Sequence, residues 1–170
     1  GADIAAVGRT PAEETVEKVR ALGRKAQIVS ADLSSIEPVQ RVVDETIAKL
    51  GGLDILINNA GIIRRADSVD FTEEDWDAVI DTNLKSTFFL AQAAGRHMLA
   101  QGSGKIVNIA SLLSFQGGIR VPSYTASKSG VAGLTKLLAN EWAAKGVNVN
   151  AIAPGYIATN NTAALQADET

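Results

Sequence analysis

Residues 54–61 read Asp-Ile-Leu-Ile-Asn-Asn-Ala-Gly. The first four residues form a short apolar run with the length of a buried strand. The last four include Asn and Gly, which tolerate unusual backbone angles. Loops that follow the buried strands of α/β proteins often bind ligands. This stretch therefore predicts a buried strand that runs directly into a ligand-binding loop.

Apolar runs and amphipathic segments alternate on both sides of this strand. Further strands are predicted at residues 3–7, 26–30, 105–110 and 147–152. Helices are predicted at about residues 10–23, 34–51, 72–98 and 124–145. The first two helices are expected to begin with capping boxes, from Thr10 to Glu13 and from Ser34 to Glu37. The alternation implies parallel strands with right-handed crossovers, so the predicted fold class is α/β with a doubly wound, Rossmann-like parallel sheet.

The composition limits the classes of function that the chain can serve. It carries 16 Lys plus Arg against 19 Asp plus Glu and has no dense basic block, so nucleic acid is not an expected partner. No apolar stretch approaches the roughly 18 residues of a membrane span, so we expect a cytoplasmic protein without a membrane partner. The chain has no Cys and one His, His97, so we expect no disulfide and no metal site.

Three residues near the predicted strand ends could carry proton chemistry. Tyr124 and Lys128 are four positions apart on a predicted helix, so phenol and ammonium share one face. A fixed ammonium favours the phenolate form, which makes a tyrosine useful as an acid or base. Ser111 follows a strand directly and could donate a hydrogen bond to a carbonyl oxygen. Taken singly, each also fits an ordinary structural role: a turn cap, a packed ring or a solvated cation.

Several motifs occur together in one order and spacing. They are Asn58-Asn59-Ala60-Gly61, Asn83, Ser111, Tyr124 to Lys128, and Pro154-Gly155 with Thr159. In this combination the chain resembles the short-chain dehydrogenase/reductase family over essentially its whole length. The resemblance implies an NAD(P)-dependent oxidoreductase that acts on CH–OH groups, with a hydride passing between nicotinamide and substrate.

The resemblance also implies roles for particular residues. Tyr124 would be the general acid/base and Ser111 would hold the substrate carbonyl. Lys128 would bind the nicotinamide ribose, and Asn83 would support a proton-relay water. Cofactor contacts are expected at Arg9, Asp32, Leu33, Asn59, Ala60, Gly61, Tyr124, Lys128, Pro154, Gly155, Ile157 and Thr159.

The choice of cofactor depends on the end of the first strand, where the chain reads Gly8-Arg9-Thr10. An acidic residue at this place would bind a ribose 2′-hydroxyl, whereas Arg favours a 2′-phosphate. The cofactor is therefore expected to be NAD or NADP, with a lean towards NADP.

The substrate is expected to be a keto or hydroxy sugar acid. Residues 63–65, 113–120 and 158–162 resemble the sugar-acid dehydrogenases of the family, which act on deoxygluconate-type or gluconate-type compounds. Arg binds a carboxylate bidentately, so we hypothesise that at least one nearby Arg anchors the substrate acid. The candidate substrate residues are Ser111, Tyr124, Arg64, Arg65, Gln116 and Arg120. The alternative is that these Arg side chains are solvated or form oligomer contacts.

The chain departs from the family at both ends. Family members begin with one more strand, a glycine-rich turn and a helix, and no G-x-x-x-G-x-G sequence occurs here. Residues 1–170 are therefore expected to be a single incomplete dinucleotide-binding domain, an internal portion of a longer enzyme. The additional strand is central in the family's sheet, so a gap is expected between the strand at Asp3 and the strand at Asp54.

Other functions and an assembly stay open at this point. The same residues would serve another carbonyl substrate, such as a 3-ketoacyl thioester or a polyol. A non-catalytic nucleotide-binding fragment would retain the motifs without turnover. The full-length enzyme is expected to be a homotetramer built through two long helices, with candidate contacts at Phe88, Phe89, Leu134, Leu138 and Trp142.

Overall fold

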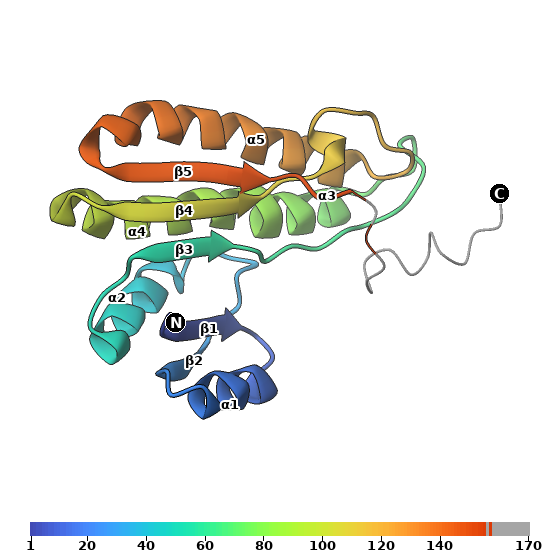
Figure 1. The fold of residues 1–170 in the computed structure, drawn as a ribbon. Coiled ribbons are helices and arrows are strands. Elements are labelled where there is room, and N and C mark those ends of the chain that lie inside the picture. The colour runs from blue at the N-terminus through green and yellow to red at the C-terminus, as the bar shows by residue number, and fades with distance from the viewer. Residues whose placement is uncertain (156, 158–170) are drawn as a thin grey trace.

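The structure is a computed structural model that describes residues 1–155 and 157 (Figure 1). Its strands are β1 (Ile4–Gly8), β2 (Ala26–Ser30), β3 (Ile55–Asn58), β4 (Gly104–Ile109) and β5 (Val147–Ile152). Its α-helices are α1 (Glu13–Ala21), α2 (Val39–Leu50), α3 (Glu73–Ile80), α4 (Ser86–Gln101) and α5 (Pro122–Trp142). A π-helical turn, η1 (Asp81–Lys85), joins α3 to α4, and the short 3-10 turns are η2 (Leu112–Ser114) and η3 (Ala143–Lys145).

The strands pair in parallel, as the alternating pattern predicts. β1 pairs with β2, and β3, β4 and β5 form a second sheet in that order. Within residues 1–155 and 157, β1 and β3 do not pair, which confirms the expected gap (Figure 1). On the unpaired edge strand β3, Ile55 is 52% exposed and Ile57 is 61% exposed.

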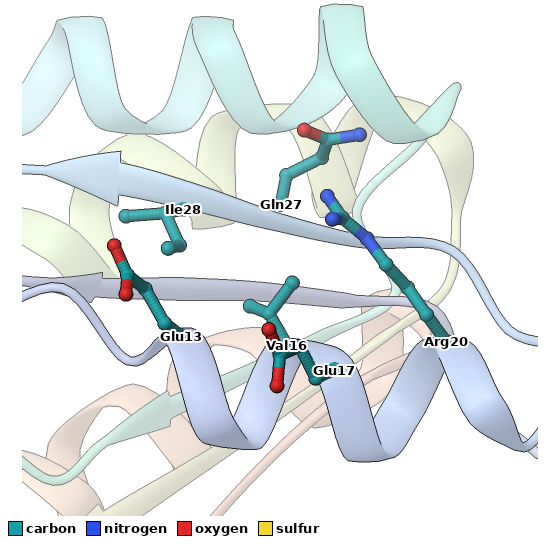
Figure 2. A pocket seen from close by; sticks show the side chains of 6 residues that line it. All are labelled: Glu13, Val16, Glu17, Arg20, Gln27 and Ile28. Carbon is teal, nitrogen blue, oxygen red and sulfur yellow. The ribbon is translucent and has the colours of Figure 1, made fainter.

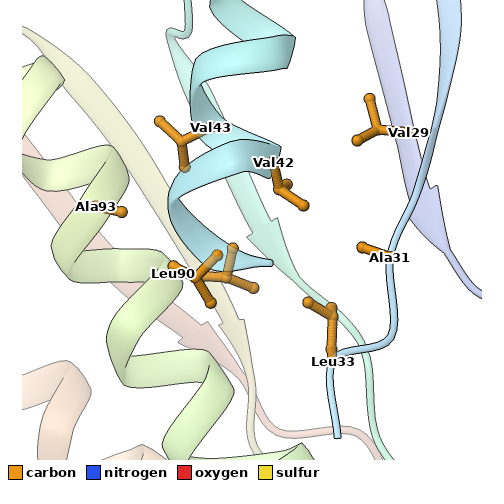
Figure 3. Packing of buried hydrophobic residues seen from close by; sticks show 8 residues of the cluster. Val29, Ala31, Leu33, Val42, Val43, Leu90 and Ala93 are labelled. Carbon is orange, nitrogen blue, oxygen red and sulfur yellow. The ribbon is translucent and has the colours of Figure 1, made fainter. Parts of the chain in front are cut away.

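Two apolar clusters hold the sheets and helices together. The first contains Val42 and Val43 of α2, which lie between α4 and the end of β2 (Figure 3). The second joins α4 to β4, β5 and the end of α5. Because α4 belongs to both clusters, it connects the β1–β2 unit to the larger sheet.

The second cluster also changes an expectation about assembly. Leu138 and Trp142 are 3% and 9% exposed, and a methyl group on Gly95 would lie 2.7 Å from Trp142 Cη2. These two side chains are therefore part of the intramolecular core and are not available as subunit contacts. Phe88 and Phe89 are half-buried and pack edge to face at 5.2 Å, and Leu134 is also half-buried.

The two predicted capping boxes are wrong, although both helices are present. α1 begins at Glu13 with Ala12 as N-cap, so Thr10 lies outside the helix. α2 begins at Val39, and no side chain caps it. The amide of Ser34 instead donates to the carboxylate of Asp32, because such local turns compete with helix initiation. Thr72 does cap α3, and its hydroxyl oxygen accepts from the Asp75 amide at 3.2 Å.

Among residues 1–155 and 157, no helix has the length and apolar composition needed to span a bilayer. The same residues contain no group of His, Cys, Asp and Glu side chains arranged to hold a metal ion.

Candidate active site

Ser111 follows the end of β4 after one residue and is the N-cap of the η2 turn. Its hydroxyl oxygen accepts a hydrogen bond from the amide of Leu113 at 3.2 Å, and its own amide donates to Ser114 Oγ at 3.2 Å. The Ser114 hydroxyl in turn donates to the carbonyl oxygen of Lys128 at 2.7 Å. The turn that carries Ser111 is therefore attached to the middle of α5.

Helix α5 brings Tyr124 and Lys128 together. It starts at Pro122, where the fixed φ of proline suits a first helical position. Lys128 Nζ lies 5.7 Å from the centroid of the Tyr124 ring, which confirms that the two side chains share one face. The same nitrogen donates to the carbonyl oxygen of Ile109, at the end of β4, at 2.6 Å. Phenol, ammonium and strand end thus meet in one place.

The environment of Lys128 is unusual for a lysine. The residue is 5% exposed, and in the described structure no carboxylate forms an ion pair with it. Burial disfavours the charged form and lowers the pKa of Lys128 from 10.5 to about 8. The group is still mostly protonated at neutral pH, so a positive charge lies beside the Tyr124 ring.

Asn83 lies in the π-helical turn η1, which explains an amide residue inside a long helical segment. Its Oδ1 accepts from the Ile62 amide at 2.8 Å, and its Nδ2 donates to the Ile62 carbonyl oxygen at 2.9 Å. Nδ2 also lies 3.3 Å from Ser127 Oγ, and the Ser127 hydroxyl donates to the Tyr124 carbonyl oxygen at 2.8 Å. Asn83 therefore links the loop after β3 to the helical turn of Tyr124. Such π-turns are frequent at functional sites.

The loop that follows β3 passes close to these groups. A methyl group on Gly61 would lie 3.3 Å from Asn83 Oδ1 and 3.8 Å from Lys128 Nζ. Asn59, Ala60 and Gly61 are all exposed. The structure thus brings the predicted cofactor loop to Asn83 and Lys128.

A buried amide ladder supports this loop from inside the sheet. Asn58 Nδ2 donates to Asn108 Oδ1 at 2.9 Å, and Asn108 Nδ2 donates to Thr135 Oγ1 at 2.9 Å. The buried Asn58 Oδ1 has no hydrogen-bond partner within the described part of the chain. Sequence reasoning missed Asn108 and Thr135, although an Asn within a strand that is otherwise apolar signals a buried polar contact.

The segment after β5 lies beside the Ser111 turn. The amide of Leu112 donates to the Pro154 carbonyl oxygen at 3.2 Å, and a methyl group on Gly155 would lie 3.4 Å from Leu112 Cδ1. Ile157 is 59% exposed. Thr159 and the rest of residues 158–162, expected to contact cofactor or substrate, lie outside the described residues.

The β1–β2 unit carries the other predicted cofactor residues. Arg9 and Asp32 follow these strands and lie 4.0 Å apart, with side chains 70% and 53% exposed. Hydrogen bonds from Ser34 lower the pKa of the Asp32 carboxyl below its ordinary value. The Leu33 side chain is in the first apolar cluster, so only its backbone could face a ligand.

The candidate substrate arginines differ in their partners. Arg64 Nε pairs with Asp75 at 3.0 Å and Arg120 Nε pairs with Asp67 at 3.0 Å. The exposed Arg65 has no ion pair or side-chain hydrogen bond within the described residues. The Ala66 amide also donates to the Arg120 carbonyl oxygen at 3.1 Å, which joins this loop to the loop that contains Gln116. Gln116 is exposed just after η2.

A separate hollow of about 360 Å³ lies between α1 and β2 (Figure 2). It is lined by Glu13, Val16, Glu17, Arg20, Gln27 and Ile28. The Arg20 guanidinium donates to the Ala26 carbonyl oxygen at 2.8 Å, so its role there is structural. None of the predicted site residues lines this hollow.

Tyr124 and Lys128 lie on α5, and hydrogen bonds through Ser114 and Ser127 link Ser111 and Asn83 to the same helix. The profile of the short chain dehydrogenase family matches residues 1–170. The chain belongs to this family. The fold class predicted from the sequence is thereby confirmed.

Individual relatives are similar to the chain in sequence and in structure. The chain is 58% identical to the 2-dehydro-3-deoxy-D-gluconate 5-dehydrogenase of Escherichia coli K12 over 99% of its length and 67% of that protein. The structure of a candidate 2-deoxy-D-gluconate 3-dehydrogenase from Agrobacterium tumefaciens with bound NADP is 60% identical, with a TM-score of 0.87, over 99% of this chain and 67% of that one. A gluconate 5-dehydrogenase from Burkholderia cenocepacia in complex with NADP and tartrate is 39% identical, with a TM-score of 0.92, over the same shares. The chain thus spans about two thirds of each relative.

The residues present fit the two ends of a dinucleotide cofactor. At one end, the exposed Asn59 to Gly61 backbone runs against Lys128, which offers ammonium hydrogens, with Pro154 and Gly155 beside the Ser111 turn. At the other end, Arg9 offers a guanidinium for a phosphate.

Proposed function

We propose that the protein is an NAD(P)-dependent oxidoreductase that interconverts a hydroxy and a keto sugar acid of the deoxygluconate or gluconate type. The observation that carries this proposal is the buried Lys128 ammonium, which lies 5.7 Å from the Tyr124 ring centroid and donates to Ile109 at the end of β4, two residues before Ser111. The names of the Escherichia coli, Agrobacterium tumefaciens and Burkholderia cenocepacia relatives support the substrate class.

In this proposal four side chains have different roles in the reaction. Tyr124 takes the proton of the substrate hydroxyl during oxidation and returns it to the carbonyl oxygen during reduction. The Ser111 hydroxyl donates a hydrogen bond to the same oxygen, where negative charge develops. The Lys128 ammonium lies beside the Tyr124 ring and binds the nicotinamide ribose. Asn83 fixes the loop after β3 and supports a water that passes the proton onward. The nicotinamide ring, when bound, supplies or accepts the hydride.

The cofactor proposed is NADP, with NAD as the alternative. Arg9 is 70% exposed and its carboxylate neighbour Asp32 is 4.0 Å away, a loose exposed pair that leaves the guanidinium available for a 2′-phosphate. The Agrobacterium tumefaciens and Burkholderia cenocepacia structures both hold NADP. Leu33, Asp32 and the Asn59 to Gly61 loop would contact the remainder of the dinucleotide, and Thr159 and Ile157 its nicotinamide end.

The proposed anchor for the substrate carboxylate is Arg65. Arg64 and Arg120 are each engaged by a carboxylate at 3.0 Å, whereas Arg65 makes no ion pair among the described residues. A free guanidinium binds a carboxylate bidentately. The structure of the Burkholderia cenocepacia relative is in complex with tartrate, a hydroxy acid, which supports a carboxylate-binding role.

A substrate panel tests the proposal. NADPH and NADH oxidation would be followed with keto sugar acids, a 3-ketoacyl thioester and a keto polyol, on wild type and Tyr124→Phe, after the intact mass is checked. We expect turnover with a keto sugar acid that falls at least about 100-fold in the variant, because a general acid contributes that much or more. Preference for the thioester or polyol would contradict the substrate class. Cofactor binding without any turnover would favour a non-catalytic nucleotide-binding module.

We also propose that the full-length enzyme is a cytoplasmic homotetramer that pairs through α4 and α5. Leu137 on α5 is 47% exposed and Leu134 is half-buried, so α5 retains apolar area for a partner copy. Phe88 and Phe89 of α4 are half-buried and pack in part against the two apolar clusters. Sedimentation of wild type and Leu137→Glu would test the interface. A monomeric wild type would contradict it.

A further inference from the structure

Ser114 has no part in the chemistry described so far, yet its hydroxyl bridges two site segments. Ser114 Oγ accepts from the Ser111 amide at 3.2 Å and donates to the Lys128 carbonyl oxygen at 2.7 Å. One hydroxyl thus accepts a hydrogen bond from an amide at the start of η2 and donates one to a carbonyl within α5. The residue is half-buried, so water competes little for either partner.

This bridge closes a ring of contacts. Lys128 is held at its ammonium by the Ile109 carbonyl oxygen and at its backbone by Ser114. Ile109 lies two residues before Ser111 on the same strand end. Ser111 and Lys128 are therefore connected twice, once through the strand and once through the Ser114 hydroxyl. Removal of the hydroxyl leaves the strand connection and the 3.5 Å contact of Ser129 Oγ with the Ser114 carbonyl oxygen.

We propose that Ser114 is a positioning residue that fixes the Ser111 hydroxyl relative to the Tyr124 and Lys128 turn of α5. The inference rests on the proposed function, because Ser111 and Tyr124 must address the same substrate oxygen. The Ser114 hydroxyl touches neither substrate nor cofactor and acts through the amide of Ser111. Its contribution is orientation, which affects kcat more than cofactor binding.

The test compares Ser114→Ala with Ser114→Thr and a matched control, Ser129→Ala. Ser129 is exposed on α5, and its hydroxyl reaches the Ser114 carbonyl oxygen at 3.5 Å. We expect Ser114→Ala to lower kcat roughly tenfold with the Kd for NADPH unchanged, since a 1 Å misplacement can lower a rate about 100-fold. Ser114→Thr, which keeps the hydroxyl, should restore most of kcat. Ser129→Ala should behave as wild type.

A double-mutant cycle separates positioning from a general loss of stability. If Ser114 acts through Ser111, then Ser114→Ala should change kcat far less in a Ser111→Ala background than in wild type. Equal fold-losses in both backgrounds, or a wild-type kcat in Ser114→Ala, would overturn the inference.

A second readout keeps the inference testable whatever the substrate is. Ser114→Ala should speed hydrogen exchange at the Ser111 amide, which loses its acceptor, while Ser129→Ala should not. If wild type prefers another carbonyl compound, the substrate class fails and the kcat comparison runs on that compound. If no compound is turned over, the proposed function fails, and unchanged exchange at Ser111 would overturn the bridge as well.

Discussion

The ammonium nitrogen of Lys128 donates a hydrogen bond to the carbonyl oxygen of Ile109 at 2.6 Å. The carbonyl dipole at the end of β4 is thus the partner of a buried charge that forms no ion pair within the described structure. A single neutral acceptor compensates only part of the solvation that a buried ammonium loses. The cation remains beside Tyr124 because the fold holds it there, and this has consequences for stability.

The first prediction concerns the pH dependence of that stability. Burial lowers the pKa of Lys128 from 10.5 to about 8, so between these values the unfolded chain binds more protons than the folded one. The free energy of unfolding should therefore rise with pH across this window through Lys128, by roughly 3 kcal/mol at most. Below pH 8 both states are protonated and the contribution of Lys128 is constant.

Urea unfolding of wild type and Lys128→Met at several pH values would measure this effect. Met keeps the length of the side chain and removes the titrating group. The difference in unfolding free energy, wild type minus variant, should grow between pH 8 and pH 10.5. Parallel curves would show that Lys128 titrates at its ordinary value and that its burial is less complete.

The second prediction compares alanine substitutions at two glycines, Gly61 near Asn83 and Gly133 on α5. Gly61→Ala places a methyl group 3.3 Å from Asn83 Oδ1, an atom already held by the Ile62 amide, so the loop must shift by a few tenths of an ångström. We expect the Kd for NADPH to rise about tenfold with little change in fold. Gly133→Ala on α5 meets nothing within 4 Å and should stabilise the helix by about 0.5–1 kcal/mol. Equal cofactor affinity in the two variants would contradict the close approach of the loop.

Much of the fold follows from patterns that are local in sequence. β2 and β5 span the predicted residues because a short apolar run bounded by turn residues has few alternatives. The end of α2 at Gly51 was also predicted, and this residue adopts the left-handed conformation that glycine favours. The helix expected to end near residue 98 instead runs to Gln101, where Gly102 is the C-cap. Helix starts were harder, because an Asp or Ser can bond the backbone in a local turn instead of a cap.

The candidate site likewise combines features that local sequence patterns predict with features that they do not. The shared face of Tyr124 and Lys128 follows from helical spacing and could be predicted. The bridge through Ser114 and the ladder from Asn58 to Asn108 join residues 14 and 50 positions apart, and no local pattern indicates such partners. The ion pairs of Arg64 with Asp75 and of Arg120 with Asp67 also could not be predicted, because they depend on how segments distant in the sequence pack together.

The third prediction concerns Asn83. Asn83→Ala leaves the amide and the carbonyl of Ile62 without their partners at 2.8 and 2.9 Å. We expect a loss of about 1–3 kcal/mol in unfolding free energy, because part-buried backbone groups lose their hydrogen bonds. Asn140→Ala, at an exposed position of the same chain, serves as control and should change stability by less than about 0.5 kcal/mol. Thermal unfolding monitored by circular dichroism distinguishes the two. An unchanged Tm in Asn83→Ala would mean that water replaces the side chain.

The fourth prediction concerns cofactor choice. Arg9→Ala removes an exposed guanidinium that can bind a 2′-phosphate, and it leaves Asp32 without its neighbour at 4.0 Å. The KM for NADPH should rise roughly tenfold, in keeping with one charge-assisted hydrogen bond, while the KM for NADH stays within about twofold. Steady-state kinetics with both nucleotides measures the ratio. An equal change for the two cofactors would place Arg9 away from the 2′ position.

The last prediction separates the substrate arginines. Arg65→Gln should raise the KM for a keto sugar acid roughly ten- to hundredfold with kcat nearly unchanged, because a carboxylate anchor binds ground state and transition state alike. Arg120→Gln breaks an exposed pair with Asp67 and should have a smaller effect. Arg96→Gln, exposed on α4, is the neutral control. A neutral keto sugar of the same chain length should be insensitive to Arg65→Gln, since it lacks the carboxylate. Equal losses on the acid and the neutral sugar would assign Arg65 to the shape of the loop and would leave the carboxylate to another residue.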